Sequence, residues 1–340
     1  MFLRRISKNS NKKNKKIFRS LNDQCVMKPK IYLAPLSGIT DLSFRLLSRK
    51  FGVEHCFYEM LDARALLYEH PRNGRLLKTT ENDTPLSAQL LGKEPSIMLE
   101  AAEKLIALVK ITSIDINSAC PAKKILKKGA GAALLKNKTR LGNIIKKLSS
   151  NLRIPVTVKL RAGYDRIDVK ECVKTAKLCQ TNDASTIFMH GRTALQGYSS
   201  DVNYESIRAV KEALTVPVFG SGNILNPFMG KKMFDETGCD GILIARGALG
   251  IPWIFKNTET YLKNGSNTKT LNLSTKKKIL KLHLAYIEKY KELGPAHKMG
   301  FMGKVAMHYV KGLPSARRIR EWICSIRSYG ELINIIDAVQ

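Results

Sequence analysis

Ser113-Ile114-Asp115-Ile116-Asn117-Ser118 and Val156-Thr157-Val158-Lys159-Leu160 are the two runs that decide the fold class of this 340-residue chain. Both are short and carry β-branched residues at every second position, which is typical of strands. Residues 139–152, between them, have apolar side chains at spacings of three and four, which predicts an amphipathic helix. Two strands joined in this way predict a βαβ unit and therefore a parallel sheet.

The same alternation continues in both directions along the chain. An open doubly wound sheet usually has only about five or six strands, so eight strand and helix alternations favour an α/β fold of the (β/α)8 TIM barrel type. Helical periods recur between the strands, for example over residues 96–111 and 226–237. The predicted strands are residues 31–36, 55–60, 85–91, 113–118, 156–160, 185–190, 216–220 and 241–245.

The strand pattern stops after Trp253 and a different organisation begins. Residues 264–270 form a polar linker rich in Asn and Gly, and residues 276–340 have helical periodicity throughout. We therefore predict three parts: a basic N-terminal arm over residues 1–29, a barrel over residues 30–262, and a small basic helical domain over residues 270–340.

Charge is the strongest compositional feature. The chain has 58 Lys and Arg against 28 Asp and Glu, a net charge of +30. Such an excess predicts a polyanionic partner, because each neutralised phosphate releases condensed counterions. Residues 276–320 are basic beyond the chain average. The alternative is a biased genome composition, which the Lys-rich and Asn-rich residues 9–16 would also reflect.

The cysteine content and the hydropathy indicate in which compartment the protein works. The seven cysteines are odd in number and have no Cys-x-x-Cys spacing, which argues against a disulfide framework and a metal site. We expect a protein of the reducing cytoplasm with no membrane span, since no apolar stretch approaches the length of about 18–20 residues needed to cross a bilayer. The N-terminus lacks the apolar run of a secretory signal, and a transit peptide is the alternative.

Chemically distinctive residues follow the predicted strands, where barrel enzymes place their active sites. Residues 220–223 and 245–247 are Gly-containing loops after the last two strands, a common phosphate site in this fold. Arg246 strengthens that interpretation over one of simple turn glycines. Lys159 lies in an apolar strand and needs an anionic partner such as a reduced flavin, unless its ammonium group reaches solvent.

Cys120 is the strongest candidate for a catalytic residue. It follows the strand 113–118 and precedes Pro121, at the predicted barrel mouth. A thiol with an ordinary pKa of about 8.5 keeps its proton at neutral pH and can act as a general acid. The alternative is a buried packing thiol, which is how we interpret the helical residues Cys172 and Cys179.

These segments together resemble the tRNA-dihydrouridine synthase family over residues 30–320. The resemblance rests on residues 34–41 (APLSGITD), 115–124 (DINSACPAKK), 190–193 (HGRT), 244–247 (IARG) and 252–255 (PWIF). It implies reduction of a tRNA uridine, with hydride delivered to carbon 6 of uracil and a proton from Cys120 to carbon 5. It also implies NADPH as reductant and FMN held by Pro35, Leu36, Ser37, Gln89, Lys159, His190, Ser221, Gly222, Asn223, Ala245 and Arg246. We further expect a monomer.

The same resemblance extends to the RNA substrate. Asn117, Arg192 and Tyr198 match substrate positions of the family, and residues 308–314, with Lys311, resemble its tRNA-binding helical domain. The chain departs from the family pattern in having Ala119 before the cysteine in place of Gly, Asn223 where Asp is common, and Leu36 in place of Met. Two rivals remain: a flavin barrel acting on a free pyrimidine, similar to dihydroorotate dehydrogenase, and a catalytically idle RNA-binding protein.

Overall fold

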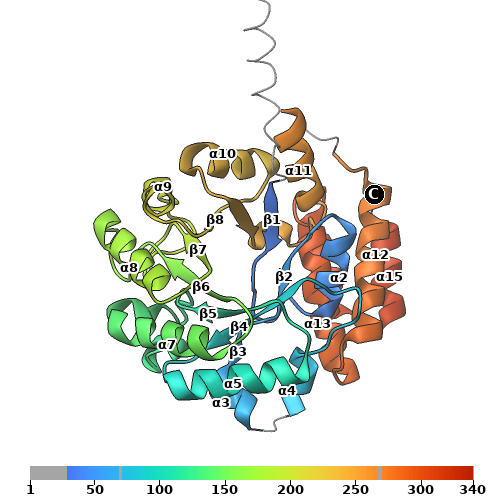
Figure 1. Cartoon of the computed structure of the whole chain (residues 1–340). Coiled ribbons are helices and arrows are strands. Elements are labelled where there is room, and N and C mark those ends of the chain that lie inside the picture. Colours follow the sequence, from blue (N-terminus) through green and yellow to red (C-terminus); the bar gives the residue numbers. More distant parts are fainter. Residues whose placement is uncertain (1–28, 69–70, 266–269, 340) are drawn as a thin grey trace, which may run out of the picture.

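The computed structural model describes residues 29–68, 71–265 and 270–339. Nearly all of the predicted basic arm therefore lies outside the described residues. The strands form one parallel sheet in the order β1-β9-β8-β7-β6-β5-β4-β2, ringed by helices (Figure 1). The ring is closed by a parallel bridge between Tyr32 and His55, with the Leu33 N–H donating to the His55 carbonyl at 3.0 Å. The predicted (β/α)8 TIM barrel is confirmed.

The strands follow the predicted runs with one difference. Of the second predicted strand, residues 55–60, only Cys56–Phe57 forms a strand, β2; a separate strand, β3, begins just after the predicted run at Leu61, and both pair with β4. Glu59 lies between the two strands, and its carboxylate accepts the Gly38 N–H at 2.5 Å. The strands are β1 (Lys30–Leu33), β2 (Cys56–Phe57), β3 (Leu61–Asp62), β4 (Leu86–Leu91), β5 (Ser113–Asn117), β6 (Val156–Arg161), β7 (Thr186–His190), β8 (Val218–Ser221) and β9 (Gly241–Ile244).

The barrel helices begin where side chains cap their free N–H groups. Asp41 accepts the Phe44 N–H at the start of α2, and Asn226 accepts the Met229 N–H at the start of α10. The helices and 3₁₀ turns are α2 (Leu42–Lys50), α3 (Ala63–Leu67), α4 (Pro71–Leu76), α5 (Pro95–Leu108), α6 (Lys123–Lys127), η1 (Gly131–Lys136), α7 (Lys138–Asn151), α8 (Val169–Thr181), α9 (Tyr204–Ala213), α10 (Pro227–Thr237), η2 (Arg246–Ala248) and α11 (Ile254–Asn264).

The barrel interior differs from one side to the other. Phe188 contacts both Phe57 and Phe219 edge-on, with ring centroids 5.4 and 5.2 Å apart. Strands β4, β5 and β6 instead direct buried polar side chains inward, among them Asp115 and Thr157. A buried polar group is costly unless it has a hydrogen-bond partner, so the polar side must form an ordered network.

The C-terminal helices have an apolar core of their own. It includes Leu284, Met302 and Leu332, and the barrel residues Leu47 and Trp253 also pack into it. In Figure 1 these helices lie together on one side of the barrel, next to α2. No helix within the described residues is long and apolar enough to cross a membrane. The helices are α12 (Leu273–Tyr290), α13 (Pro295–Tyr309), α14 (Ala316–Ser325) and α15 (Tyr329–Ala338).

Candidate active site

A cavity of about 440 Å³ opens at the carboxyl ends of the strands, where the sequence predicts the site. The polar residues around it come from loops that are far apart in the chain and meet because parallel strands all end on one rim. The predicted site residues that line it are Pro35, Leu36, Ser37, Gln89, Asn117, Cys120, Lys159, His190, Tyr198, Ser221, Gly222, Asn223, Ala245 and Arg246.

One end of the cavity is suited to a phosphate. The Arg246 guanidinium group donates to Asn223 Oδ1 at 3.1 Å and lies over the Tyr198 ring, 3.9 Å from its centroid. Gly222 has a φ of +130°, a backbone conformation that favours glycine, and an added Cβ would lie 2.9 Å from Val202 Cγ2 and 3.2 Å from His190 Cδ2. Glycine therefore lets the loop after β8 pass close to both residues. An arginine beside Gly-containing loops is a common arrangement for binding phosphate.

The middle of the cavity is electropositive. Burial and the neighbouring Arg161 lower the pKa of Lys159 to about 8. Burial together with nearby cations holds the pKa of His190 well below its usual value, so its imidazole is neutral at physiological pH. An anionic ligand would relieve the repulsion among these groups.

His190 supplies a direct test of whether a flavin fits. Its Nε2 atom is buried and has no hydrogen-bond partner among the described residues. A buried polar atom without a hydrogen-bond partner lowers the stability of the fold by about 1–3 kcal/mol. At a cavity wall, such an atom marks a position where a bound ligand can provide the missing hydrogen bond. The polar edge of an isoalloxazine ring offers donors and acceptors for that position, and Lys159 offers it a positive charge. The residues present fit a phosphorylated flavin.

Cys120 is half-buried in the loop after β5 and faces the same cavity. Its N–H and that of Ala119 both donate to Asn117 Oδ1, at 2.9 and 3.1 Å. On the other side, Arg161 donates to the Ala119 carbonyl at 2.7 Å. Gly131 packs so closely that an added Cβ would lie 2.7 Å from the Cys120 carbonyl oxygen. The backbone that carries the thiol is therefore held on several sides at the mouth.

Two predicted substrate residues are not in the cavity wall. Arg192 is fully buried, and it donates to the Ser200 carbonyl at 2.8 Å and to the Tyr198 carbonyl at 3.0 Å, so it braces the loop that carries Tyr198. Lys311 is exposed just beyond the end of α13. Their substrate roles stay predictions.

The structure also adds residues that the sequence did not single out as site residues. Arg161 lines the cavity, and Asp115 is buried beneath Gln89 and bonded to it. The alternation of a strand could have found Asp115, because residues two apart share a face and Asn117 points to the same interior. The alternation could not show that Gln89, on the neighbouring strand, is the partner of Asp115.

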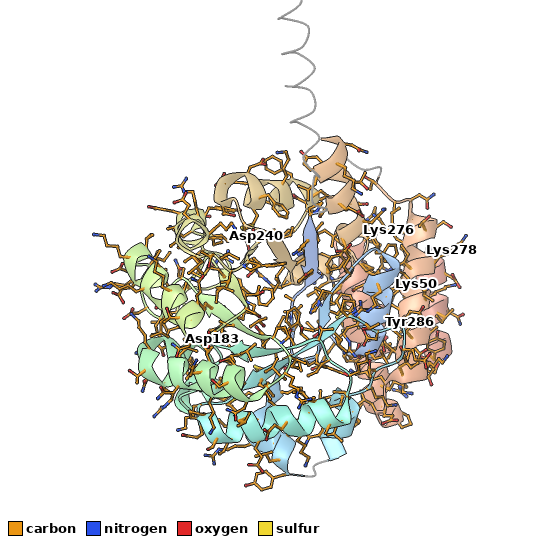
Figure 2. All side chains as sticks on the ribbon, viewed as in Figure 1. Lys50, Asp183, Asp240, Lys276, Lys278 and Tyr286 are labelled. Atoms are coloured by element: carbon orange, nitrogen blue, oxygen red, sulfur yellow. The ribbon has the colours of Figure 1, made fainter. Side chains whose placement is uncertain are left out.

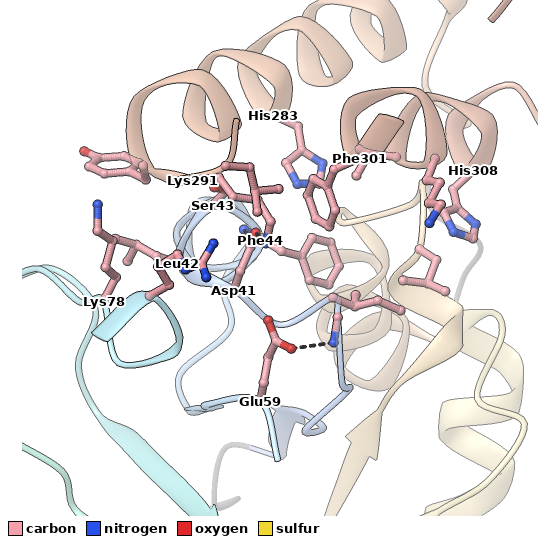
Figure 3. A pocket seen from close by; sticks show the side chains of 18 of the residues that line it. Asp41, Leu42, Ser43, Phe44, Glu59, Lys78, His283, Lys291, Phe301 and His308 are labelled. Carbon is pink, nitrogen blue, oxygen red and sulfur yellow. Dashed lines mark hydrogen bonds and ion pairs between the residues drawn. The ribbon is translucent and has the colours of Figure 1, made fainter. Parts of the chain in front are cut away.

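A second cavity of about 550 Å³ lies beside the first, between the loop after β1 and helices α12 and α13 (Figure 3). The two cavities share Ile39 and Leu249. Lys291 bridges the two parts of the protein here, since its Nζ is 2.6 Å from Asp41 Oδ2 and 3.9 Å from the Phe301 ring centroid. The exposed Lys304 and His308 also border this cavity. Ile39 and Leu249 therefore lie at the boundary between the first cavity and the one beside the helical part.

No group of three or more His, Cys, Asp or Glu side chains within the described ranges is arranged to hold a metal ion. The six cysteines of that part of the chain, Cys120 among them, are free thiols.

The fold and the site define a class: a barrel enzyme whose rim offers a phosphate end, a cationic centre and one thiol within a single cavity. Comparison with known proteins makes the class specific. The family model described as dihydrouridine synthase matches residues 32–339, and the chain belongs to this family of flavin-dependent oxidoreductases.

Curated relatives with the same family name align with this chain over most of their length. The chain is 35% identical over 293 residues to tRNA-dihydrouridine synthase B of Pseudomonas aeruginosa, covering 86% of each chain. It is 34% identical to a probable tRNA-dihydrouridine synthase of Rickettsia conorii, covering 85% of this chain and 87% of the relative.

Among solved structures, histamine dehydrogenase from Rhizobium sp. 4-9 matches with a TM-score of 0.53 at 11% identity, over 81% of this chain and 49% of the other. A 2-naphthoyl-CoA reductase matches with a TM-score of 0.54 at 10% identity, over 69% of this chain and 50% of the other. At such identities the likeness shows the shared barrel fold alone.

Proposed function

We propose that this chain is a tRNA-dihydrouridine synthase that reduces the 5,6 double bond of a uridine in tRNA. The observation that carries the proposal is the presence of one thiol and one cation-lined phosphate end in the same cavity. The relatives named as tRNA-dihydrouridine synthases over most of their length support it. The rival of a catalytically idle protein does not account for an electropositive cavity beside a free thiol.

The cofactor in this proposal is FMN, with NADPH as its reductant. Arg246, Ser221, Gly222 and Asn223 would hold the phosphate, and Lys159 and His190 would face the polar edge of the ring system. When bound and reduced, FMN supplies the hydride for carbon 6 of the uracil. Lys159 then offsets the negative charge of the reduced cofactor.

Cys120 completes the addition in this proposal. Its thiol gives a proton to carbon 5 as the 5,6 double bond is lost, and the thiolate that remains takes a proton from water before the next turnover. Asn117 Oδ1, which accepts the Cys120 N–H, and Arg161, which donates to the Ala119 carbonyl, hold the backbone that carries the sulfur at the cavity mouth. Uridine in folded tRNA has to leave its stack to reach this depth, at a cost of a few kcal/mol that phosphate contacts offset.

The domain arrangement follows from the same proposal. Residues 30–262 act as the flavin barrel, and residues 270–340 act as an RNA-binding domain whose basic residues lie next to the second cavity. Lys304 is exposed and borders that cavity, and Lys311 is exposed just beyond the end of α13. We expect a monomer that works in the cytoplasm, where its tRNA substrate and reduced thiols are found.

The proposal is tested with purified protein, added FMN and NADPH, and a tRNA transcript that lacks modified bases. We expect dihydrouridine in the transcript, measured by mass spectrometry of its nucleosides, together with matching NADPH consumption. Free uridine or uridine monophosphate serves as the comparison substrate. Equal turnover of the free pyrimidine would favour a metabolic flavoenzyme, and the absence of bound flavin would refute both functions.

A further inference from the structure

A series of hydrogen bonds runs from the interior of the barrel to the Cys120 loop. Thr157 Oγ1 donates to Asp115 Oδ1 at 2.6 Å, and Gln89 Nε2 donates to Asp115 Oδ2 at 2.7 Å. Asn117 Nδ2 donates to Gln89 Oε1 at 2.7 Å. Asn117 Oδ1 finally accepts the N–H of Cys120. This Asp115 network thus connects three neighbouring strands, β4, β5 and β6, to the loop.

The Asp115 network has a single direction, and the carboxylate sets it. An ionised carboxylate only accepts hydrogen bonds, so Gln89 must present its NH₂ group to Asp115 and its carbonyl oxygen to Asn117. Asn117 must then donate to that oxygen, which leaves its own Oδ1 directed at the loop. The reversed amides would direct an NH₂ group at two backbone N–H groups, donor against donor.

Burial keeps water from replacing any bond of the Asp115 network. Asp115 is 0% exposed, Gln89 2% and Asn117 5%, so none of the three has ready access to solvent as a substitute partner. Burial raises the pKa of Asp115 to about 6, while the hydrogen bonds from Thr157 and Gln89 oppose the rise. The carboxylate is therefore ionised at neutral pH and remains an acceptor.

We infer that Asp115 is a positioning residue, which fixes the place of the Cys120 thiol through Gln89 and Asn117 without touching the substrate. The inference rests on the proposed role of Cys120 as proton donor. Arg161 and Gly131 hold the carbonyl side of the loop, and the Asp115 network holds its N–H side. Loss of the N–H anchors would let the loop open and move the thiol away from its target.

The test compares Asp115→Leu, which removes both acceptor oxygens and keeps the branching at Cγ, with Asp115→Asn, which keeps an acceptor for Gln89. Ser87→Ala is the matched control, because Ser87 is equally buried on β4 but bonds to Ser113 and His55 outside the Asp115 network. Thr157→Val is a milder variant that removes one donor to Asp115 and serves if Asp115→Leu does not fold. All variants are studied as the FMN-loaded full chain.

The first readout is independent of RNA. Alkylation of Cys120 by iodoacetamide is followed on the tryptic peptide of residues 111–123, in which Cys120 is the single cysteine. Opening of the loop should raise the alkylation rate of Asp115→Leu by about threefold or more, whereas Ser87→Ala should match the parent. An unchanged rate in Asp115→Leu, with Thr157→Val also unchanged, would overturn the inference whether or not the protein modifies tRNA.

The second readout separates the half-reactions. Reoxidation of the reduced flavin by tRNA should fall about 10- to 100-fold in Asp115→Leu, the usual effect of misplacing a reacting group by about 1 Å. Reduction by NADPH should stay within about threefold, and Asp115→Asn should restore most of the tRNA rate. Equal losses in both half-reactions would indicate a merely structural role and contradict the inference, as would an Asp115→Asn variant as slow as Asp115→Leu.

Discussion

Replacing Arg246 by Ala tests the phosphate end of the cavity most directly. Among the described residues the guanidinium group makes one hydrogen bond, to Asn223 Oδ1, and it lies over the exposed Tyr198 ring, so its other N–H groups can meet a ligand. A hydrogen bond to a charged group contributes about 1.5–3 kcal/mol. Since about 1.4 kcal/mol is a factor of ten in affinity, Arg246→Ala should weaken FMN binding about 10- to 100-fold.

The assay is titration of the flavin-free protein with FMN, followed by the change in flavin fluorescence. Riboflavin, which has the same ring system without the phosphate, is titrated in parallel. The affinity for riboflavin should be nearly the same in parent and variant, because the lost contact is with the phosphate alone. Arg208→Ala, an exposed arginine on α9 away from the cavity, is the matched control.

Two results would refute the assignment. One is an Arg246→Ala protein that is folded and still binds FMN with parental affinity. The other is a loss of riboflavin affinity as large as the loss of FMN affinity, which would show that the arginine supports the ring pocket through Tyr198 rather than the phosphate.

Three further predictions concern the remaining parts of the site. Cys120→Ala should slow dihydrouridine formation about 10²- to 10⁴-fold in single-turnover assays while NADPH still reduces the flavin, and Cys179→Ala, which removes a buried thiol of α8, should not. Because Lys159 has a lowered pKa of about 8, its protonated form is lost as pH rises above that value. FMN affinity should then fall by at most about tenfold per pH unit, a dependence that Lys159→Gln should abolish in the same titration. Replacing both Lys304 and Lys311 by Gln should lower the salt dependence of tRNA binding by about one unit of slope per lost phosphate contact, and an unchanged slope would move the RNA path elsewhere.

The matched control for the last of these is the pair Lys276 and Lys278, which Figure 2 places near the amino end of α12. Lys291, which borders the second cavity, is 15 positions beyond Lys276, about 22 Å along a helix of 1.5 Å rise per residue. Charge at the far end of α12 should contribute less to RNA binding than charge beside the cavity. The nearby Lys281 is less suitable because it pairs with Asp337 of α15.

Much of the fold follows from local pattern. Strands such as Ser113–Asn117 and Val156–Arg161 form where β-branched runs occur, and helices such as Lys138–Asn151 form where apolar residues recur at three and four. The prediction missed that β2 ends at Phe57 and that a separate strand, β3, begins at Leu61. Tyr58 and Glu59 are buried like the residues of the strand itself, and periodicity reports burial along one segment, so it cannot show where the pairing with β4 is interrupted.

The order of residues by itself determined which side chains reach the rim, because the end of a parallel strand is a position that sequence can identify. Cys120, Lys159 and His190 were found in that way. Only the tertiary structure decided their states and partners. Closure of the sheet sets Asp115 opposite Thr157, leaves His190 Nε2 without a partner among the described residues, and turns Arg192 away from the cavity. Register and burial across strands are properties of the closed barrel, so no single segment contains them.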